Sequence, residues 1–454
     1  MTGKNTIVSA LAILFVLTGP AGASAQGLEW GGSLTVNSEL SAGKSFDFPS
    51  GSFDSLGLDL LLHMEANPTE KVRVYAEASL TNLAMPVSIS GIADLSSWQA
   101  LNHVEARLGE TYVDLYDFIL PHVDIRLGRQ RIAWGPAETI GIIDSLDPLD
   151  LENPLRFGKR IPSDALAVRV YLHPVKIEGV YIPVFRPSLL PLDASSLMPA
   201  APIDLPSPLA AHAASLDVKL PAEDAAAQAT LGARLGLALG SFDLAASYVY
   251  GRQSLPAVTR VAGSFFSVMP PLVDLAVTLE YPRQHLVGLD AAGEILGIGV
   301  WAEAAYAWPD LTLVTDMRAI GGELQSEDAE PYLKAVVGMD YTFPIDLYVN
   351  LQYAHGLFHE AAPEDLNDYL LLGLEWRMSG GFVKLGPVGV ALEVDDLLDI
   401  EGSWAVVLNP ELTVYPMDGV ELAVGARWVE GKEATTFGSQ KEANGIYARA
   451  KVSF

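Results

Sequence analysis

Histidines and clustered carboxylates are the residues of this sequence that could do chemistry. His355 and His359 have the i, i+4 spacing of a helical metal pair, but Gly356 favours a solvent-exposed loop. His103 and His285 are candidates for general acid–base catalysis on a surface lipid, but the sequence has no Gly-x-Ser-x-Gly motif that would supply a nucleophile. We therefore expect no catalytic site, no metal site and no cofactor. The acidic loop residues are expected to be solvated charges: Glu327, Asp328, Glu330, Glu364, Asp365, Asp395, Asp396 and Asp399.

Composition narrows the class of protein further. The chain has 454 residues, 50% of them hydrophobic, a formal charge of −28 and no cysteine. These values exclude a disulfide-stapled fold and a Cys-type zinc site, and they argue against nucleic-acid binding. Aromatic residues run through the whole length, which argues against intrinsic disorder.

The first 25 residues have the features of a secretory signal peptide. Lys4 supplies a positive charge, 7–17 is a short apolar run, and Ala23-Ser24-Ala25 fits a small-residue cleavage pattern. We predict cleavage before Gln26, which leaves 26–454 as the mature domain. The alternative is an uncleaved anchor. Export of a chain without cysteine predicts a location in the bacterial cell envelope. There we expect the chain to contact the barrel-assembly machinery.

In the mature chain, apolar and polar residues alternate with period two over many segments. Ile446, Ala448, Ala450 and Val452 alternate with polar residues up to the last residue, Phe454. Similar alternation occurs at 72–81, 370–378 and 420–428. In a strand, such sets project to opposite faces. One face is apolar, and the other carries charges of both signs.

A soluble sandwich also alternates in this way, but three features favour a transmembrane antiparallel β-barrel. The strands are about ten residues long, which is enough to cross a bilayer when tilted. Aromatic residues such as Trp376 and Trp428 fall near strand ends. A terminal aromatic on an alternating strand, here Phe454, is typical of the assembly signal of outer-membrane barrels.

Short and long connections alternate along the chain, as expected of short periplasmic turns and long extracellular loops. Counting strands between them gives about 18, with 16 as the alternative because 272–293 is ambiguous. The segment 185–227 is unusually apolar for a loop. We expect it, together with 134–163, to fold partly into the lumen; the alternative is a cap packed on its own neighbours.

The polar faces of the strands define the expected lining of the lumen. These residues are Arg73, Glu77, Glu110, Tyr112, Asp114, Arg126, Arg129, Arg131, Arg377, Arg427 and Arg449.

Two strands depart from strict alternation. Val104, Ala106 and Leu108 would share a face with Glu110, and Ile125 and Leu127 would share one with Arg129. An arginine at the bilayer midplane costs roughly 2–4 kcal/mol. We therefore predict one extra residue at Gly109 and another at Gly128, a lumen-facing contact between Glu110 and Arg129, and outward Ile132 and Trp134.

The segment 127–155 resembles a poorly characterised proteobacterial outer-membrane barrel family. Its signature residues are Gly128, Arg129, Gln130, Trp134, Gly135, Asp147, Pro148 and Asp150, although the family usually has Asn at Ser145 or Asp147. Alginate-export and substrate-selective porins are a more distant likeness. The resemblance implies an outer-membrane barrel. Members often accompany lipid exporters, so it also implies a hydrophobic cargo and two partners: a periplasmic lipid-carrier lipoprotein and an inner-membrane exporter.

These observations favour a channel in the outer membrane, in contact with its bilayer and lipopolysaccharide, that carries a hydrophobic or amphipathic solute such as a lipid. A barrel enzyme acting on surface lipid is one alternative. A non-conducting structural or adhesion barrel is the other.

Overall fold

The computed structural model describes residues 27–42, 52–83, 103–138, 140–151, 158–190, 210–268, 271–395 and 399–454. The expected signal peptide, Asp396 and the middle of 185–227 lie outside these residues. Within the described part of the chain, no helix has both the length and the apolar character needed to cross a membrane.

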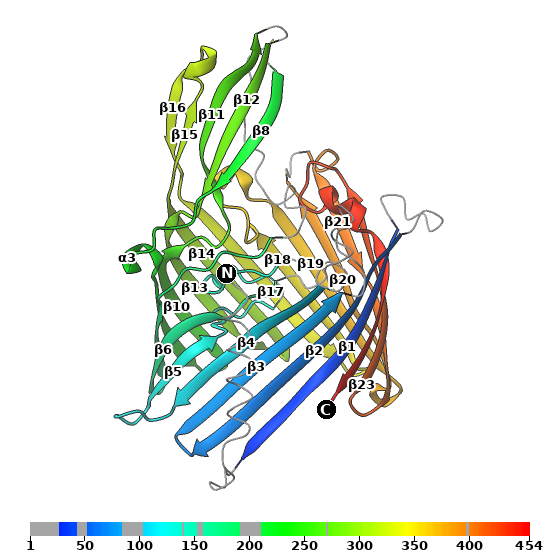
Figure 1. The fold of residues 1–454 in the computed structure, drawn as a ribbon. Coiled ribbons are helices and arrows are strands. Elements are labelled where there is room, and N and C mark those ends of the chain that lie inside the picture. The colour runs from blue at the N-terminus through cyan, green and yellow to red at the C-terminus, as the bar shows by residue number, and fades with distance from the viewer. Residues whose placement is uncertain are drawn as a thin grey trace.

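The chain forms a closed antiparallel barrel of 18 strands with a mean radius of 18 Å (Figure 1). The expected fold class and strand count are confirmed. The wall strands follow one another in chain order, and β21 and β22 together make one of them. They are β1 (Leu28–Ser41), β2 (Ser52–Thr69), β3 (Val72–Leu83), β4 (His103–Leu115), β5 (Val123–Gln130), β6 (Ser163–Leu172), β7 (Val175–Ile182), β9 (Thr230–Leu239), β10 (Phe242–Arg252), β13 (Arg283–Ile295), β14 (Ile298–Asp310), β17 (Tyr332–Phe343), β18 (Leu347–His355), β19 (Asp368–Met378), β20 (Val383–Val394), β21 (Trp404–Asn409), β22 (Glu411–Met417), β23 (Val420–Gly431) and β24 (Gly445–Ser453).

The first and last strands close the barrel. β1 pairs with β24 from Ser33 opposite Ser453 to Ser41 opposite Gly445. Phe454 and Gly32 exchange two backbone hydrogen bonds of 3.0 Å. Closure removes both sheet edges, as a barrel in lipid requires.

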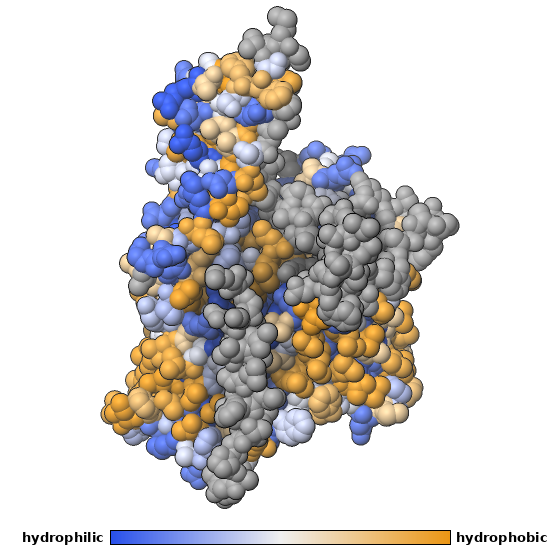
Figure 2. Space-filling model, in the orientation of Figure 1, coloured by the Kyte–Doolittle hydropathy of each residue, from blue (hydrophilic) through white to orange (hydrophobic). Residues whose placement is uncertain are grey.

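Alternation of side chains gives the wall an apolar exterior. Figure 2 shows hydrophobic residues gathered over the lower half of the barrel on the face in view, with polar residues towards its lower rim. Exposed members of this band include Leu80, Leu127, Leu289, Leu370 and Val424. An outward apolar band is typical of a transmembrane barrel.

The bulge predicted at Gly109 is confirmed. Thr111 lies opposite Ala76 and Leu108 opposite Ala78, so Gly109 and Glu110 together face Glu77. One extra residue shifts the alternation of β4, so that Leu108 and Thr111 both point outward. Glu110, Tyr112 and Asp114 then point into the lumen.

A second sheet stands beyond the long-loop end of the barrel, above β10, β13 and β14 (Figure 1). Its strand order is β16-β15-β11-β12-β8, and three separate loops supply it. We call it the outer sheet. Its strands are β8 (Ala210–Val218), β11 (Ala257–Val268), β12 (Pro271–Glu280), β15 (Thr312–Asp316) and β16 (Leu324–Asp328). The later part of the apolar segment 185–227 therefore contributes an edge strand outside the barrel, where inward folding was expected. The start of the segment does turn inward: Leu189 exchanges backbone hydrogen bonds with Leu149 and Leu151 of the 134–163 segment, at 2.9 and 3.0 Å.

Candidate functional site

The chain leaves the wall at Gln130 and turns into the barrel, as expected for the 134–163 segment. We call residues 131–162 the inward loop. Its apolar side chains are buried together with residues of many wall strands, from β6 round to β23. The loop contributes Ile132, Trp134, Ile140, Ile142, Ile143 and Leu146, and the wall contributes Ala165, Ala167, Val249, Leu286, Ala305, Val336, Ala354 and Val429, among others. Each large apolar side chain buried in this way stabilises the packed loop by about 1.5–3 kcal/mol.

Small wall residues make room for the loop. A Cβ atom at Gly232 would lie 2.8 Å from the ring of Trp134, and one at Gly288 would lie 3.0 Å from Ile143. These glycines of β9 and β13 allow the loop to approach the strand backbone.

Glu303 of β14 holds the loop through its backbone. Its carboxylate accepts hydrogen bonds from the amides of Ala137 and Ile142, both at 2.9 Å, and of Ile143 at 3.3 Å. The Glu303 side chain is buried and touches Gly135 so closely that a Cβ atom there would collide with it. A buried carboxylate that receives several amide hydrogen bonds can stay ionised without a cationic partner.

Charged residues fix the two stems of the loop to each other. Arg131 contacts Asp144 and donates to the carboxylate of Asp147 at 2.7 Å. Asp147 also accepts the amide of Ile132 at 2.6 Å, and its own carbonyl accepts from Arg160 at 2.9 Å. Burial raises the pKa of Asp147 and lowers that of Arg160, so each relies on its partners to stay charged.

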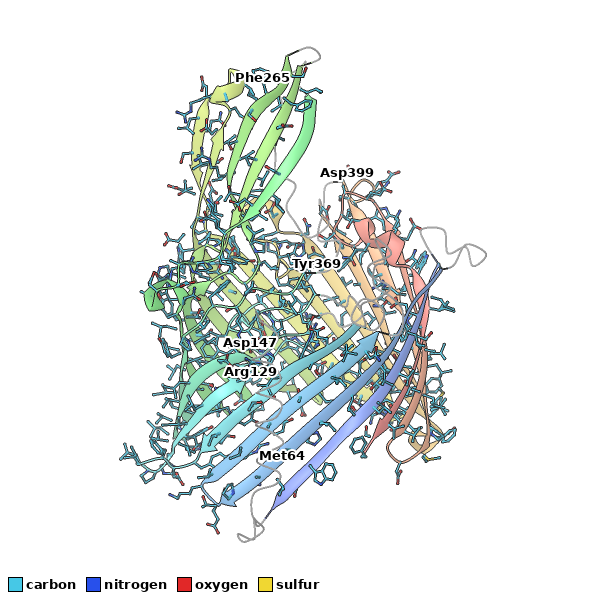
Figure 3. The ribbon with its side chains drawn as sticks, viewed as in Figure 1. Met64, Arg129, Asp147, Phe265, Tyr369 and Asp399 are labelled. Carbon is cyan, nitrogen blue, oxygen red and sulfur yellow. The ribbon has the colours of Figure 1, made fainter. Side chains whose placement is uncertain are left out.

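The signature residues of the sequence meet in and beside this loop. Gln130 donates to the carbonyl of Ala165 at 2.9 Å, and the carbonyl of Pro148 accepts the amide of Ile161 at 2.8 Å. Asp150 pairs with Lys159 at 2.6 Å and with Arg107 of β4 at 3.5 Å. Figure 3 shows Arg129 at the upper end of β5 and Asp147 beside it.

The prediction that Arg129 faces the lumen is wrong. β4 and β5 pair without interruption, with Tyr112 opposite Gly128 and Thr111 opposite Arg129, so β5 has no extra residue. Gly128 adopts a φ of +129° within this continuous pairing. Arg129 therefore shares the outward face of Leu127.

A carboxylate and a backbone carbonyl explain why an outward arginine is tolerated. Arg129 pairs at 2.9 Å with Asp164 of β6, which also contacts Arg186, and it donates at 3.1 Å to the carbonyl of Leu108. These interactions offset the cost of facing the membrane near the end of a strand, where that cost is lowest. The predicted contact between Glu110 and Arg129 is accordingly wrong.

Glu110 instead accepts the backbone amide of Arg131 at 2.7 Å. The outward positions expected for Ile132 and Trp134 are also wrong, because the chain has already turned inward and both side chains lie in the buried cluster.

Most of the other expected lumen residues lie in two groups on the inner wall. Arg126 pairs with Asp114 at 2.6 Å and lies 3.9 Å from the ring centre of Tyr112. Arg73 pairs with Glu65 at 2.7 Å in the same group, and Glu77 accepts from Tyr75 at 3.2 Å. On the other side of β1 and β2, Arg449 of β24 pairs with Glu411 of β22 at 2.8 Å. Arg377 pairs with Glu375 at the short-turn rim.

Two further loops turn inward beside the first. In the loop 356–367, Glu360 accepts the amide of Leu357 at 2.7 Å and contacts Tyr369 of β19. In the loop 432–444, the amides of Thr436 and Phe437 both donate at 2.7 Å to Glu393 of β20. Burial lowers the pKa of His359, beside Glu360, to about 4.

The three loops leave a cavity of about 1360 Å³ inside the barrel, lined by wall residues from β13 to β23. We call it the lumenal cavity. Its apolar lining includes Leu149, Leu286, Phe358, Leu371, Val407 and Val429, and its charged lining includes Asp144, Arg160, Lys334, Glu360, Asp395 and Arg427. Arg427 is the expected lumen residue that reaches it. In the described part of the chain, no group of three His, Asp or Glu residues is arranged to hold a metal ion.

Sequence reasoning missed the carboxylates that hold the loops, Glu303, Glu360 and Glu393. Glu303 interrupts a run of alanines, Ala302 to Ala305, on a strand that otherwise has no acidic residue before Asp310. That isolated charge was an available signal of a special contact, but it did not identify the partner.

Comparisons with known proteins support the fold. No protein-family model matches the chain, and no curated protein sequence matches it. The crystal structure of Acinetobacter baumannii OccAB3 matches with a TM-score of 0.50 at 10% identity, covering 94% of this chain and 99% of that one. OccAB1 of the same organism has a TM-score of 0.49 at 7% identity and covers 96% of this chain and 98% of its own. At this identity, the likeness to OccAB3 shows a shared fold and no more.

Proposed function

We propose that this protein is an outer-membrane channel for a hydrophobic or amphipathic solute. One observation carries the proposal: the inward loop narrows an 18-stranded barrel to a lumenal cavity of about 1360 Å³ with a mixed lining. A barrel of this strand number would otherwise enclose a wide aqueous channel. Leu371, Val407 and Val429 suit an apolar tail, while Arg160, Lys334 and Arg427 suit a polar head.

The proposal includes a route to the membrane. Cleavage of 1–25 before Gln26 would release the mature barrel for insertion by the assembly machinery, with Phe454 as its signal. The family resemblance supports a periplasmic lipid-carrier lipoprotein and an inner-membrane exporter as partners. The intact mass of the mature protein tests the cleavage site, and recovery from the soluble periplasmic fraction would contradict the location.

Planar-bilayer recording of the purified protein tests the channel itself. We expect small, discrete KCl conductances, because the inward loop fills much of the lumen. A protein that inserts stably but never conducts would support the structural or adhesion alternative. Hydrolysis of phospholipid vesicles by the purified protein would instead support the enzyme alternative.

A further inference from the structure

The backbone ladder of the barrel is interrupted in the middle of one wall. β20 pairs with β22 up to Leu385 opposite Leu412, and pairing resumes with β21 at Gly389 opposite Asn409. Residues 386–388 and 410–411 between these points make no ladder pairs with each other. We call this region the ladder gap. The neighbouring ladder with β23 is interrupted at the same height, where Asn409 and Pro410 on one side and Ala426 and Arg427 on the other make no ladder pairs.

Two prolines account for the ladder gap. Pro387 and Pro410 have no N–H group to donate across it, and proline inside a sheet is normally confined to edges and bulges. β20 is also irregular on its other side, where Leu374 pairs with Val388 but Trp376 pairs with Leu385. The ladder gap is therefore weakly connected on the β19 side as well. On the far side, β23 stays attached through the amide of Ala426, which donates to the carbonyl of Pro410 at 3.0 Å.

The lumenal cavity reaches the ladder gap from the inside. Pro387, Gly389, Asn409 and Arg427 all line the cavity. On the outside, Pro410 is exposed, and Leu385 and Leu412 flank it on the apolar face. The cavity and the hydrocarbon of the bilayer are thus separated here by a wall whose ladder between β20 and the next strand is interrupted.

We propose that the ladder gap is a lateral opening through which an amphiphile with one acyl chain and an anionic head passes between the lumenal cavity and the membrane. The tail would cross between β20 and β22, while the head stays on the lumenal side near the guanidinium of Arg427. The proposal rests on the channel function proposed above. It adds the substrate class and the route.

The chain contains no cysteine, so a disulfide can be used to lock the wall. A Cβ atom at Gly389 would lie 3.9 Å from that of Asn409, within the range of disulfide geometry. The variant Gly389→Cys/Asn409→Cys would thus tie β20 to β21 directly beside the ladder gap. The matched control is Gly373→Cys/Asn350→Cys, another glycine–asparagine pair, with a distance of 3.7 Å, in the continuous ladder of β18 and β19.

Uptake of radiolabelled oleate into Gram-negative cells that lack their own fatty-acid channel provides the readout. We expect the oxidised lock to lower uptake at least fivefold and dithiothreitol to restore it. The control pair should change uptake less than twofold, and both variants should give wild-type amounts of folded barrel on heat-modifiable gel electrophoresis. Equal uptake by the two oxidised variants would overturn the lateral route. Conductance without oleate uptake by the wild type would overturn this proposal alone, whereas the absence of both would overturn the channel function.

A second measurement does not depend on the disulfide. Asn409→Cys labelled with bimane should be quenched by 9,10-dibromostearate added to vesicles, because the brominated chain would enter beside it. Asn37→Cys, labelled in the same way on the inner face of β1 away from the lumenal cavity, should be quenched at least threefold less. Equal quenching at both positions would overturn the proposal.

Discussion

Glu303 and Ile142 are separated by 161 residues in the chain, yet the carboxylate of the first accepts the amide of the second at 2.9 Å. With Ala137 and Ile143, this contact gives three loop amides one common acceptor. The loop is therefore fastened at its backbone, and the identity of its side chains matters less at this point than the carboxylate opposite.

Replacing Glu303 should open the channel. Glu303→Ala leaves three buried amides without an acceptor, at a cost of about 1–3 kcal/mol each. We expect a larger single-channel conductance and faster amide hydrogen exchange in the inward loop. Glu303→Gln keeps one acceptor oxygen and should give an intermediate conductance. An unchanged conductance for Glu303→Ala would show that the loop is held by its apolar contacts alone.

Substitution of Arg131 should have a much larger effect on the inward loop than substitution of Arg129, although the two residues are only two positions apart. Arg131→Met removes the cation beside the buried Asp147, and breaking a buried pair costs about 3–5 kcal/mol, less here because Arg131 is 28% exposed. We expect the pKa of Asp147 to rise further and the conductance to become noisier. Arg129→Met removes only an outward pair, worth about 0.2–1 kcal/mol.

Single-channel recordings of the two arginine variants side by side check this prediction. Equal current noise in both would contradict the assignment of Arg131 to the loop.

Acid should loosen the loop 356–367. Burial and the nearby Lys334 hold the pKa of His359 at about 4, below its usual 6.5. The packed loop is then fully stable above pH 6.5 and loses about 1.4 kcal/mol per pH unit as pH falls from 6.5 towards 4. Burial raises the pKa of the adjacent Glu360, and its protonation acts in the opposite direction.

The difference between wild type and His359→Gln isolates the histidine, since Glu360 is present in both. Protease cleavage within the loop should increase on acidification in the wild type and much less in the variant. Identical pH profiles would remove His359 from the explanation.

Phe454 should affect assembly more than conduction. Its backbone bonds to Gly32 remain in Phe454→Ala, but the terminal aromatic side chain, 62% exposed, is lost. We expect less folded barrel on heat-modifiable gel electrophoresis and an unchanged conductance per molecule. Val452→Ala, an outward residue of the same strand, is the control. Normal amounts of folded Phe454→Ala would contradict the assembly role.

Local patterns in the sequence were sufficient to predict the strands that form the wall of the barrel. Alternation and the spacing of turns predicted 18 strands, and the misplaced Glu110 predicted the bulge at Gly109. The same reasoning failed at Gly128, because it assumed that an outward arginine needs a shift in register. Asp164, 35 residues away, neutralises Arg129 instead, and such a long-range partner has no local signal.

The contents of the lumen were harder to predict for a related reason. Trp134 and Ile132 look like membrane-facing strand residues, and only the turn of the chain after Gln130 makes them part of an interior core. The outer sheet was missed because its strands lie in three different loops and pair partly in parallel, as β8 does with β12 and β11 with β15.

The outer sheet connects three hairpins of the barrel, β7–β9, β10–β13 and β14–β17, at the ends of their long loops. Within the barrel, these hairpins are joined only by the pairing of neighbouring wall strands. β8 comes from the connection after β7, β11 and β12 from the one after β10, and β15 and β16 from the one after β14. Shortening any one of these loops would expose a strand edge in the others, and exposed edges promote aggregation. Insertions and deletions in them are therefore expected to be correlated through evolution, unlike those of independent surface loops.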